Sequence, residues 1–117
     1  MRWFQKLFFF TSVALFLASG LYAQSYTPQE AAQHIGETAT IQGVVVQVSS
    51  SKGTTFINFG GRFPNHIFYA VIFDDYADLF PGVHDLEGRT LAISGEISPY
   101  RGKPQIILTS PDQLSLP

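Results

Sequence analysis

The stretch from Arg89 to Thr109 (RTLAISGEISPYRGKPQIILT) most constrains the fold. Apolar residues and glycine recur at every second position from Leu91 to Ile97, with polar or small residues between them. This alternation is typical of a half-buried strand. The segment Pro99–Pro104 is a loop by composition, and Gln105–Thr109 is a β-branched returning strand. We therefore expect a β-hairpin with a tight basic turn.

A second long strand is expected from Thr38 to Val48, and its apolar pattern changes phase. We place the change at Gly43, because the apolar residues before and after it occupy opposite phases: Ala39 and Ile41, then Val44, Val46 and Val48. A glycine at a phase change predicts a bulge, through which one strand serves two halves of a barrel.

Two further strands are expected at Thr54–Phe59 and Ile67–Phe73, separated by a turn at Arg62–Asn65. The strand pattern then breaks between Asp74 and Gly88. A short helix is predicted there, which ends at Pro81–Gly82 and has Tyr76, Leu79 and Phe80 on one apolar face.

Short capping elements are expected at both ends of the domain. Thr27–Glu30 has the sequence of a capping box, which predicts a short helix that ends at Gly36 and turns Ala31, Ala32 and Ile35 towards the barrel. Ser110–Leu114 is expected to cap the barrel mouth.

Five strands with a helical connection between the third and fourth predict an all-β fold with short helices, the five-stranded OB-fold Greek-key barrel. Segments 41–46, 54–60 and 93–106 resemble OB-fold nucleic-acid-binding domains of the single-strand and anticodon-binding type, as in small bacterial exported proteins. The resemblance covers about residues 38–114. It implies a binding face over the second and third strands, and its motifs define the fold more than the ligand.

Residues 1–23 are predicted to be a signal peptide, which leaves one domain at 24–117. Arg2 and Lys6 precede an apolar run from Leu7 to Ala18, and small residues lead to a cleavage site after Ala23. An uncleaved membrane anchor is the rival interpretation. We expect an exported protein, periplasmic or secreted, whose mature form is not embedded in a membrane. Because the chain has no cysteine, disulfides and bacterial lipidation at a signal-peptide cysteine are excluded.

From Gln24 onwards the chain has five basic and nine acidic residues, a net charge of −4. This balance argues against a delocalised electrostatic grip on nucleic acid. Four of the basic residues nevertheless fall in loops. Lys52, Arg101 and Lys103 lie beside the expected binding face, and Arg62 follows the second of the expected sheet strands. They predict a locally positive groove, although solvated charges at hairpin tips give the same pattern.

Aromatic candidates for base stacking are Phe56, Tyr69 and Tyr100, and Asn58 is a candidate for contacts to base edges. The assignment depends on strand phase, because Phe56 and Asn58 face the groove only if Ile57 and Phe59 point inward. The alternative is that these aromatic side chains belong to the core.

No enzyme, metal site or cofactor is predicted. OB-like barrels also occur in nucleases of the thermonuclease type, but no arginine lies near the carboxylates of Asp74, Asp75 and Asp78 in sequence. Histidines 34, 66 and 84 lack the spacing of a metal site. The expected function is weak binding of single-stranded nucleic acid or another polyanion. A periplasmic or envelope protein bound to the same face, or to an exposed strand edge, is the alternative.

Overall fold

The computed structural model describes residues 24–117, so the predicted signal peptide lies outside the described residues. Two short elements precede the barrel, β1 (Ser25–Tyr26) and the 3₁₀ helix η1 (Pro28–His34). The barrel strands are β2 (Thr38–Ser51), β3 (Thr54–Phe59), β4 (Phe68–Ile72), β5 (Thr90–Glu96), β6 (Ser98–Tyr100) and β7 (Lys103–Ile107). Further 3₁₀ helices are η2 (Asp74–Leu79), η3 (Val83–Leu86) and η4 (Pro111–Gln113), followed by the short strand β8 (Leu114–Ser115).

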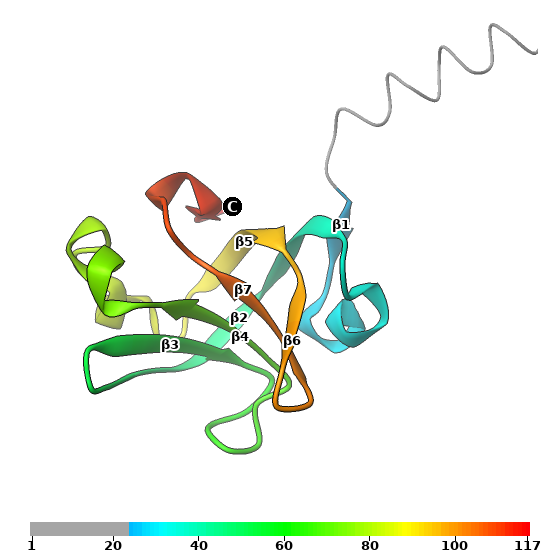
Figure 1. Cartoon of the computed structure of the whole chain (residues 1–117), viewed down its shortest axis with the longest axis horizontal. Coiled ribbons are helices and arrows are strands. Elements are labelled where there is room, and N and C mark those ends of the chain that lie inside the picture. The colour runs from blue at the N-terminus through cyan, green and yellow to red at the C-terminus, as the bar shows by residue number, and fades with distance from the viewer. Residues whose placement is uncertain (1–23) are drawn as a thin grey trace, which may run out of the picture.

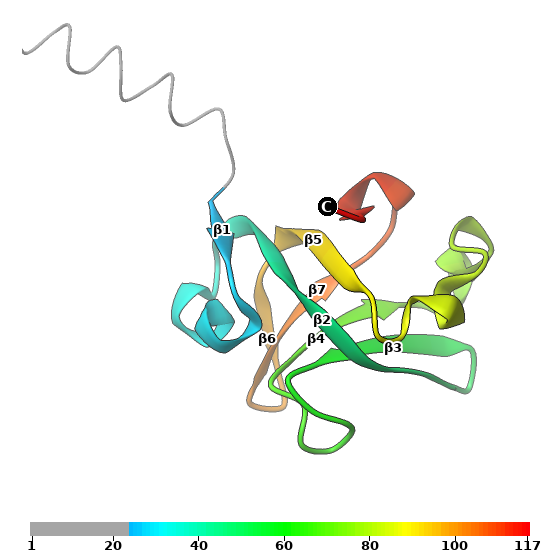
Figure 2. The same ribbon diagram turned by 180° about the vertical axis from the view of Figure 1, so that it is seen from behind.

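The strands form one curved sheet in the order β6-β7-β4-β3-β2-β5-β8, with β1 added in parallel to β2 (Figures 1 and 2). The pairs β2–β3, β3–β4 and β2–β5 are antiparallel, whereas β4 and β7 are parallel. This arrangement confirms the predicted all-β, barrel-like fold. The barrel is not closed, because β5 and β7 do not pair with each other.

The long strand β2 serves both halves of the barrel, as predicted, but its irregularity lies beyond Gly43. The segment from Thr38 to Val44 pairs with β5, and the segment from Val45 to Ser51 pairs with β3, with a register shift between Val45 and Gln47. The inward phase therefore continues through Gly43 to Val45 and changes only afterwards.

Gly43 does not mark the bulge that was predicted there, but has a packing role. A Cβ at Gly43 would lie 2.6 Å from Cγ of Pro28 in η1, well inside van der Waals contact. The glycine thus lets η1 lie directly against β2. Pro28 and Ala31 are the buried residues of η1, whereas Ala32 and Ile35 are exposed, contrary to prediction.

The predicted hairpin between 89–97 and 105–109 is wrong in its pairing. The chain leaves β5 at Ile97 and forms an additional strand, β6, which pairs with β7 from Ser98↔Gln105 to Tyr100↔Lys103. The predicted six-residue loop is therefore only a two-residue turn, Arg101–Gly102, with φ angles of 51° and 81°. Positive φ at both central residues is the mark of a type I′ hairpin turn.

One side chain bridges the gap between β5 and β7. The Gln113 amide nitrogen Nε2 donates to the carbonyl oxygens of Ser94 in β5 and Ile107 in β7, each at 3.0 Å. The C-terminal segment, which was predicted to cap the barrel mouth, therefore connects two strand edges that do not pair with each other, and its Leu114 packs against the core.

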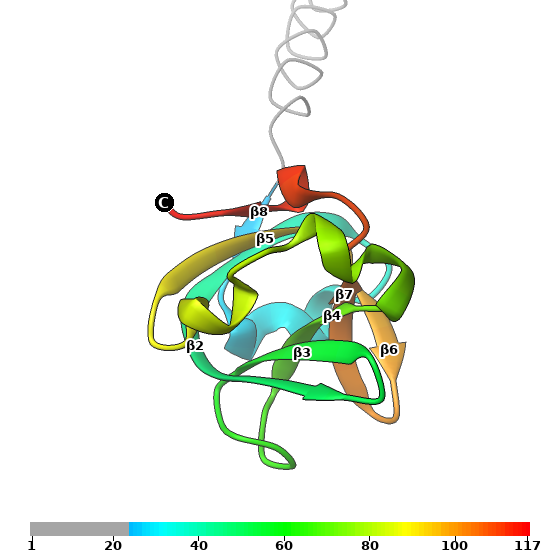
Figure 3. The same ribbon diagram turned by 90° about the vertical axis from the view of Figure 1, so that its left-hand side faces the viewer.

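The barrel interior is filled by aliphatic and phenylalanine side chains, with Ile41, Ile57, Phe59, Leu91 and Ile93 each 0% exposed. The connection between β4 and β5 covers one end of this core through η2 and η3 (Figure 3). Of the apolar face predicted there, only Phe80 is buried, while Tyr76 and Leu79 are 37% and 47% exposed. Two tight 3₁₀ turns replace the single helix expected, so the three side chains do not align on one face.

Candidate functional site

A groove of about 310 Å³ lies on the outer surface of β3 and β4. Its two walls are the loop between these strands (residues 60–67) and the β6–β7 turn, which are close together in Figures 1 and 2. The lining residues are Ser49, Phe56, Asn58, Phe63, Pro64, His66, Tyr69, Tyr100, Arg101 and Lys103. This is the face that the OB-fold resemblance indicated.

The strand phase of β3 decides which residues reach this groove. Ile57 and Phe59 are fully buried in the core, so Phe56 and Asn58 project to the outer face. The strand phase that was required for Phe56 and Asn58 to face the groove is therefore the one observed.

Aromatic rings follow one another along the groove. The Phe56 and Tyr69 ring centroids are 6.1 Å apart at an interplanar angle of 52°, and His66 meets Tyr69 edge-on at 5.2 Å. Phe63 then stacks on His66 at 5.8 Å. The floor residue Tyr69 is 5% exposed, whereas Phe63 and Tyr100 on the walls are 70% and 50% exposed. Two large aromatic surfaces therefore remain available to a flat ligand.

Positive charge enters the groove from the β6–β7 turn. Arg101 is exposed, and its guanidinium carbon lies 5.3 Å from the centroid of the Tyr100 ring. The Lys103 ammonium donates to the backbone carbonyl oxygens of Pro64 and His66, so it ties the β6–β7 turn to the 60–67 loop. No carboxylate among residues 24–117 lines the groove, so its basic side chains make it locally positive within an acidic domain.

Lys52 and Arg62 do not line the groove, although they were predicted to belong to it. Lys52 occupies the tip of the β2–β3 hairpin, at the end of the sheet near η2 (Figure 1). A Cβ on the neighbouring Gly53 would lie 2.8 Å from the Asp74 carboxylate, which shows how close η2 comes to this tip. Arg62 is exposed on the 60–67 loop, where the next residue, Phe63, forms the wall instead.

His66 also lines the groove, although it was not predicted to be a binding residue. It is 8% exposed, and its Nδ1 atom is buried without a hydrogen-bond partner among the described residues. Burial, with a smaller contribution from the Lys103 charge, lowers the pKa of His66 below its ordinary value. Burial likewise raises the pKa of the nearby Tyr69 hydroxyl. The imidazole therefore remains neutral at neutral pH, and the groove charge resides on Arg101 and Lys103.

Within residues 24–117, no group of three or more histidine or acidic side chains is arranged to hold a metal ion. The Nε2 atom of His84 lies 3.1 Å from the Ser50 hydroxyl.

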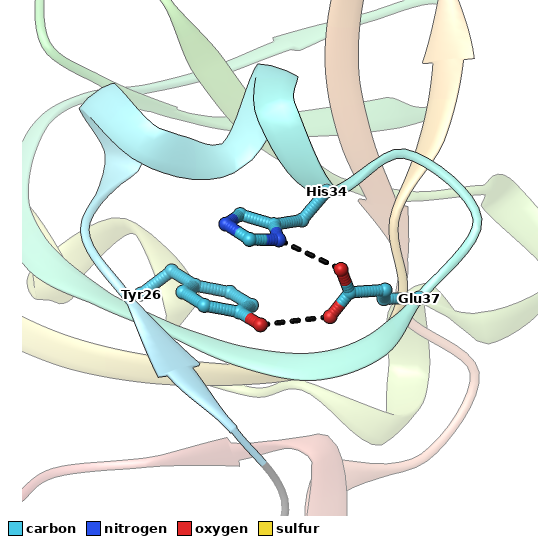
Figure 4. Close-up of polar contacts among 3 residues, drawn as sticks. All are labelled: Tyr26, His34 and Glu37. Atoms are coloured by element: carbon cyan, nitrogen blue, oxygen red, sulfur yellow. Dashed lines mark hydrogen bonds and ion pairs between the residues drawn. The ribbon is translucent and has the colours of Figure 1, made fainter.

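A separate polar cluster fastens the start of the domain (Figure 4). The Tyr26 hydroxyl donates to Oε1 of Glu37 at 2.8 Å, and His34 Nδ1 lies 2.7 Å from Oε2 of the same carboxylate. The Tyr26 and His34 rings are stacked, with centroids 3.6 Å apart. The hydrogen bond with His34, followed by that with Tyr26, lowers the Glu37 pKa. The cluster joins β1, η1 and the start of β2, away from the groove.

Comparisons with known proteins leave the family open. No family model and no curated protein matches the chain. A solved structure, "Crystal structure of a putative aspartyl-tRNA synthetase from Leishmania major Friedlin", is similar at a TM-score of 0.49 and 9% identity. The match covers 75% of this chain and 20% of that one, so this chain corresponds to about a fifth of that protein. The OB-like assignment therefore rests on the strand order and pairing described above. Within residues 24–117, no helix has the length and apolarity needed to cross a bilayer.

Proposed function

We propose that this domain binds single-stranded nucleic acid in the groove over β3 and β4. The observation that carries the proposal is the combination, in one groove, of exposed aromatic surfaces with basic side chains and no carboxylate. Proteins that bind single strands combine aromatic platforms, on which bases stack, with positive charges along the phosphate backbone.

The groove supplies both components at short range. Phe63 and Tyr100 expose their rings on opposite walls, and Arg101, the residue after Tyr100, adds a positive charge beside the Tyr100 ring. Lys103 adds a second charge that the surrounding carbonyl groups hold in place. Because the part of the chain that the structure describes places two cations in the groove, we expect weak binding, in the range of about 10⁻⁴ to 10⁻⁶ M that is typical of largely nonspecific complexes.

The test compares two ligands with the same phosphates. The chain from Gln24 onwards is titrated into a fluorescent oligothymidine and into an abasic strand of equal length, and binding is followed by anisotropy. Stacking contributes about 1–3 kcal/mol per base, so we expect the oligothymidine to bind at least about fivefold more tightly. Equal affinities would identify a general polyanion site instead. No binding of either strand at low salt would refute the proposal.

The alternative partner, an envelope protein on the same face, is favoured by the 70% exposure of Phe63 and by the net charge of −4 of the domain. We propose export for either ligand, on the basis of the signal-peptide pattern in residues 1–23. Cell fractionation with N-terminal sequencing tests this point. A protein that begins at Gln24 outside the cytoplasm supports export, and a full-length cytoplasmic protein contradicts it.

A further inference from the structure

Beside the groove residue Asn58 lies the side-chain amide of Gln47, whose orientation is determined by its neighbours. The side-chain oxygen Oε1 of Gln47, on β2, accepts a hydrogen bond from the backbone N–H of Phe63 at 2.8 Å. A backbone N–H can only donate, so Gln47 must turn its oxygen, and not its nitrogen, towards this point. The same oxygen lies 3.0 Å from the side-chain nitrogen Nδ2 of Asn58.

This contact determines the orientation of Asn58 as well. Because Gln47 presents an acceptor, Asn58 must present its NH₂ group, and its carbonyl oxygen Oδ1 therefore points elsewhere. No group of residues 24–117 donates a hydrogen bond to this oxygen. The oxygen is also not completely buried, so solvent can reach it. Asn58 itself is 2% exposed and lines the groove beside Phe56. Its oxygen is thus an unfilled acceptor at the groove floor.

We infer that the groove selects bases that carry an exocyclic amino group, with the Asn58 carbonyl as the specificity-determining contact. This inference rests on the proposed binding of single-stranded nucleic acid. At the 4-position of the ring, cytosine presents an N4 amino donor and thymine presents the O4 acceptor, so a contact of Oδ1 with this position is completed by cytosine and not by thymine. With thymine, two acceptors face each other, and the floor oxygen loses water without gaining a donor.

The size of the effect follows from a single hydrogen bond. A good bidentate base contact discriminates by about 1–3 kcal/mol, and one bond reaches the low end of that range, which corresponds to about fivefold in affinity. We therefore expect oligocytidine to bind about fivefold more tightly than oligothymidine for one contacted base.

The first experiment varies the ligand alone, so the protein fold is not at risk. Three labelled deoxyribose dodecamers are compared at one salt concentration and neutral pH: cytosine, thymine, and 2-pyrimidinone, which is cytosine without its 4-amino group. Tighter binding of the cytosine strand than of both others supports the inference. Equal binding of all three overturns the inference and leaves the proposed function intact. No binding of any strand overturns both.

The second experiment tests Gln47 as the positioning residue. Gln47→Glu retains an acceptor for Phe63 N–H and Asn58 Nδ2, so the preference for cytosine over thymine should persist. Gln47→Leu removes that acceptor and frees the Asn58 amide to rotate, so the preference should fall towards unity while oligothymidine still binds. Loss of preference in both variants, or in neither, would contradict the assigned orientation.

Discussion

Two hairpin turns of this domain have the same backbone conformation and each contains one basic residue. The positive charge of either turn can therefore be removed in a matched pair of variants. Arg101 and Lys52 have φ angles of 51° and 52°, and each precedes a glycine with positive φ, Gly102 at 81° and Gly53 at 85°. Asparagine adopts this left-handed conformation more readily than most residues. Arg101→Asn and Lys52→Asn therefore change the net charge equally without adding backbone strain, but only Arg101 lines the groove.

The magnitude follows from the number of groove cations. Two phosphate contacts, by Arg101 and Lys103, predict a slope of log affinity against log salt of about −1.4, at ~0.7 per contact for single strands. Affinity should then fall roughly sevenfold between about 50 and about 200 mM salt. Arg101→Asn should reduce the slope to about −0.7 and the loss to under about threefold, whereas Lys52→Asn should leave both unchanged.

The assay is fluorescence anisotropy of labelled oligothymidine across a salt series, with thermal unfolding of each variant as the control for folding. Equal reductions in slope for Arg101→Asn and Lys52→Asn would refute the reasoning, because binding would then respond to net charge rather than to the groove. A native slope near −2.8 would instead indicate four phosphate contacts, which would require Lys52 and Arg62 in addition.

Other predictions concern stacking, packing and titration. Tyr100→Ala should weaken oligothymidine binding by about 1–3 kcal/mol, as measured by anisotropy, while Tyr76→Ala, an exposed aromatic residue on η2, should not. Gly43→Ala should lower the free energy of unfolding by about 1–3 kcal/mol in denaturant titrations, and Pro28→Ala, which removes the atoms that clash with the new methyl group, should restore part of this loss. The lowered pKa of Glu37 means that its carboxylate stabilises the fold above the ordinary glutamate pKa, and that this contribution disappears as pH falls through the folded pKa. The difference in thermal midpoint between the native protein and Glu37→Gln should therefore shrink in acid, and a difference that grew instead would contradict the assigned hydrogen bonds.

The strands were predictable from sequence because their pattern is local. Thr54–Phe59 has the bounds observed for β3. Leu91, Ile93 and Ile97, from one predicted side of the next strand, are fully buried, although Ala92 on the other side is buried as well. The capping box at Thr27 also forms, since the Glu30 carboxylate accepts a hydrogen bond from the Thr27 backbone N–H at 2.9 Å. Such features depend on a few neighbouring residues, which the sequence shows directly.

Strand partners were harder to predict, because they depend on the whole barrel. β6 contains a proline and only three residues, so no apolar pattern marks it, and its pairing with β7 follows from the bend of the chain at Ile97. The role of Gly43 was missed for a similar reason. Its close neighbour is Pro28, which belongs to a different element.

The groove was predicted in part. Six of its residues followed from strand phase and loop position: Phe56, Asn58, Tyr69, Tyr100, Arg101 and Lys103. Phe63 and His66 were not selected, because the path of the 60–67 loop is held by Lys103 from the opposite wall and by Gln47 beneath it. The phenylalanine before Pro64 is the sequence feature that indicated a binding surface in this loop, because an exposed apolar residue in a polar turn has few structural roles.

The most direct test of the binding groove is an amide chemical-shift map of the chain from Gln24 onwards, titrated with a short oligocytidine. We predict that the largest shifts fall on β3, on residues 60–69 and on the Tyr100–Lys103 turn, with the β2–β3 tip and the Tyr26–His34–Glu37 cluster unaffected. Shifts centred on η2, η3 or β8, with the groove amides unmoved, would contradict the account.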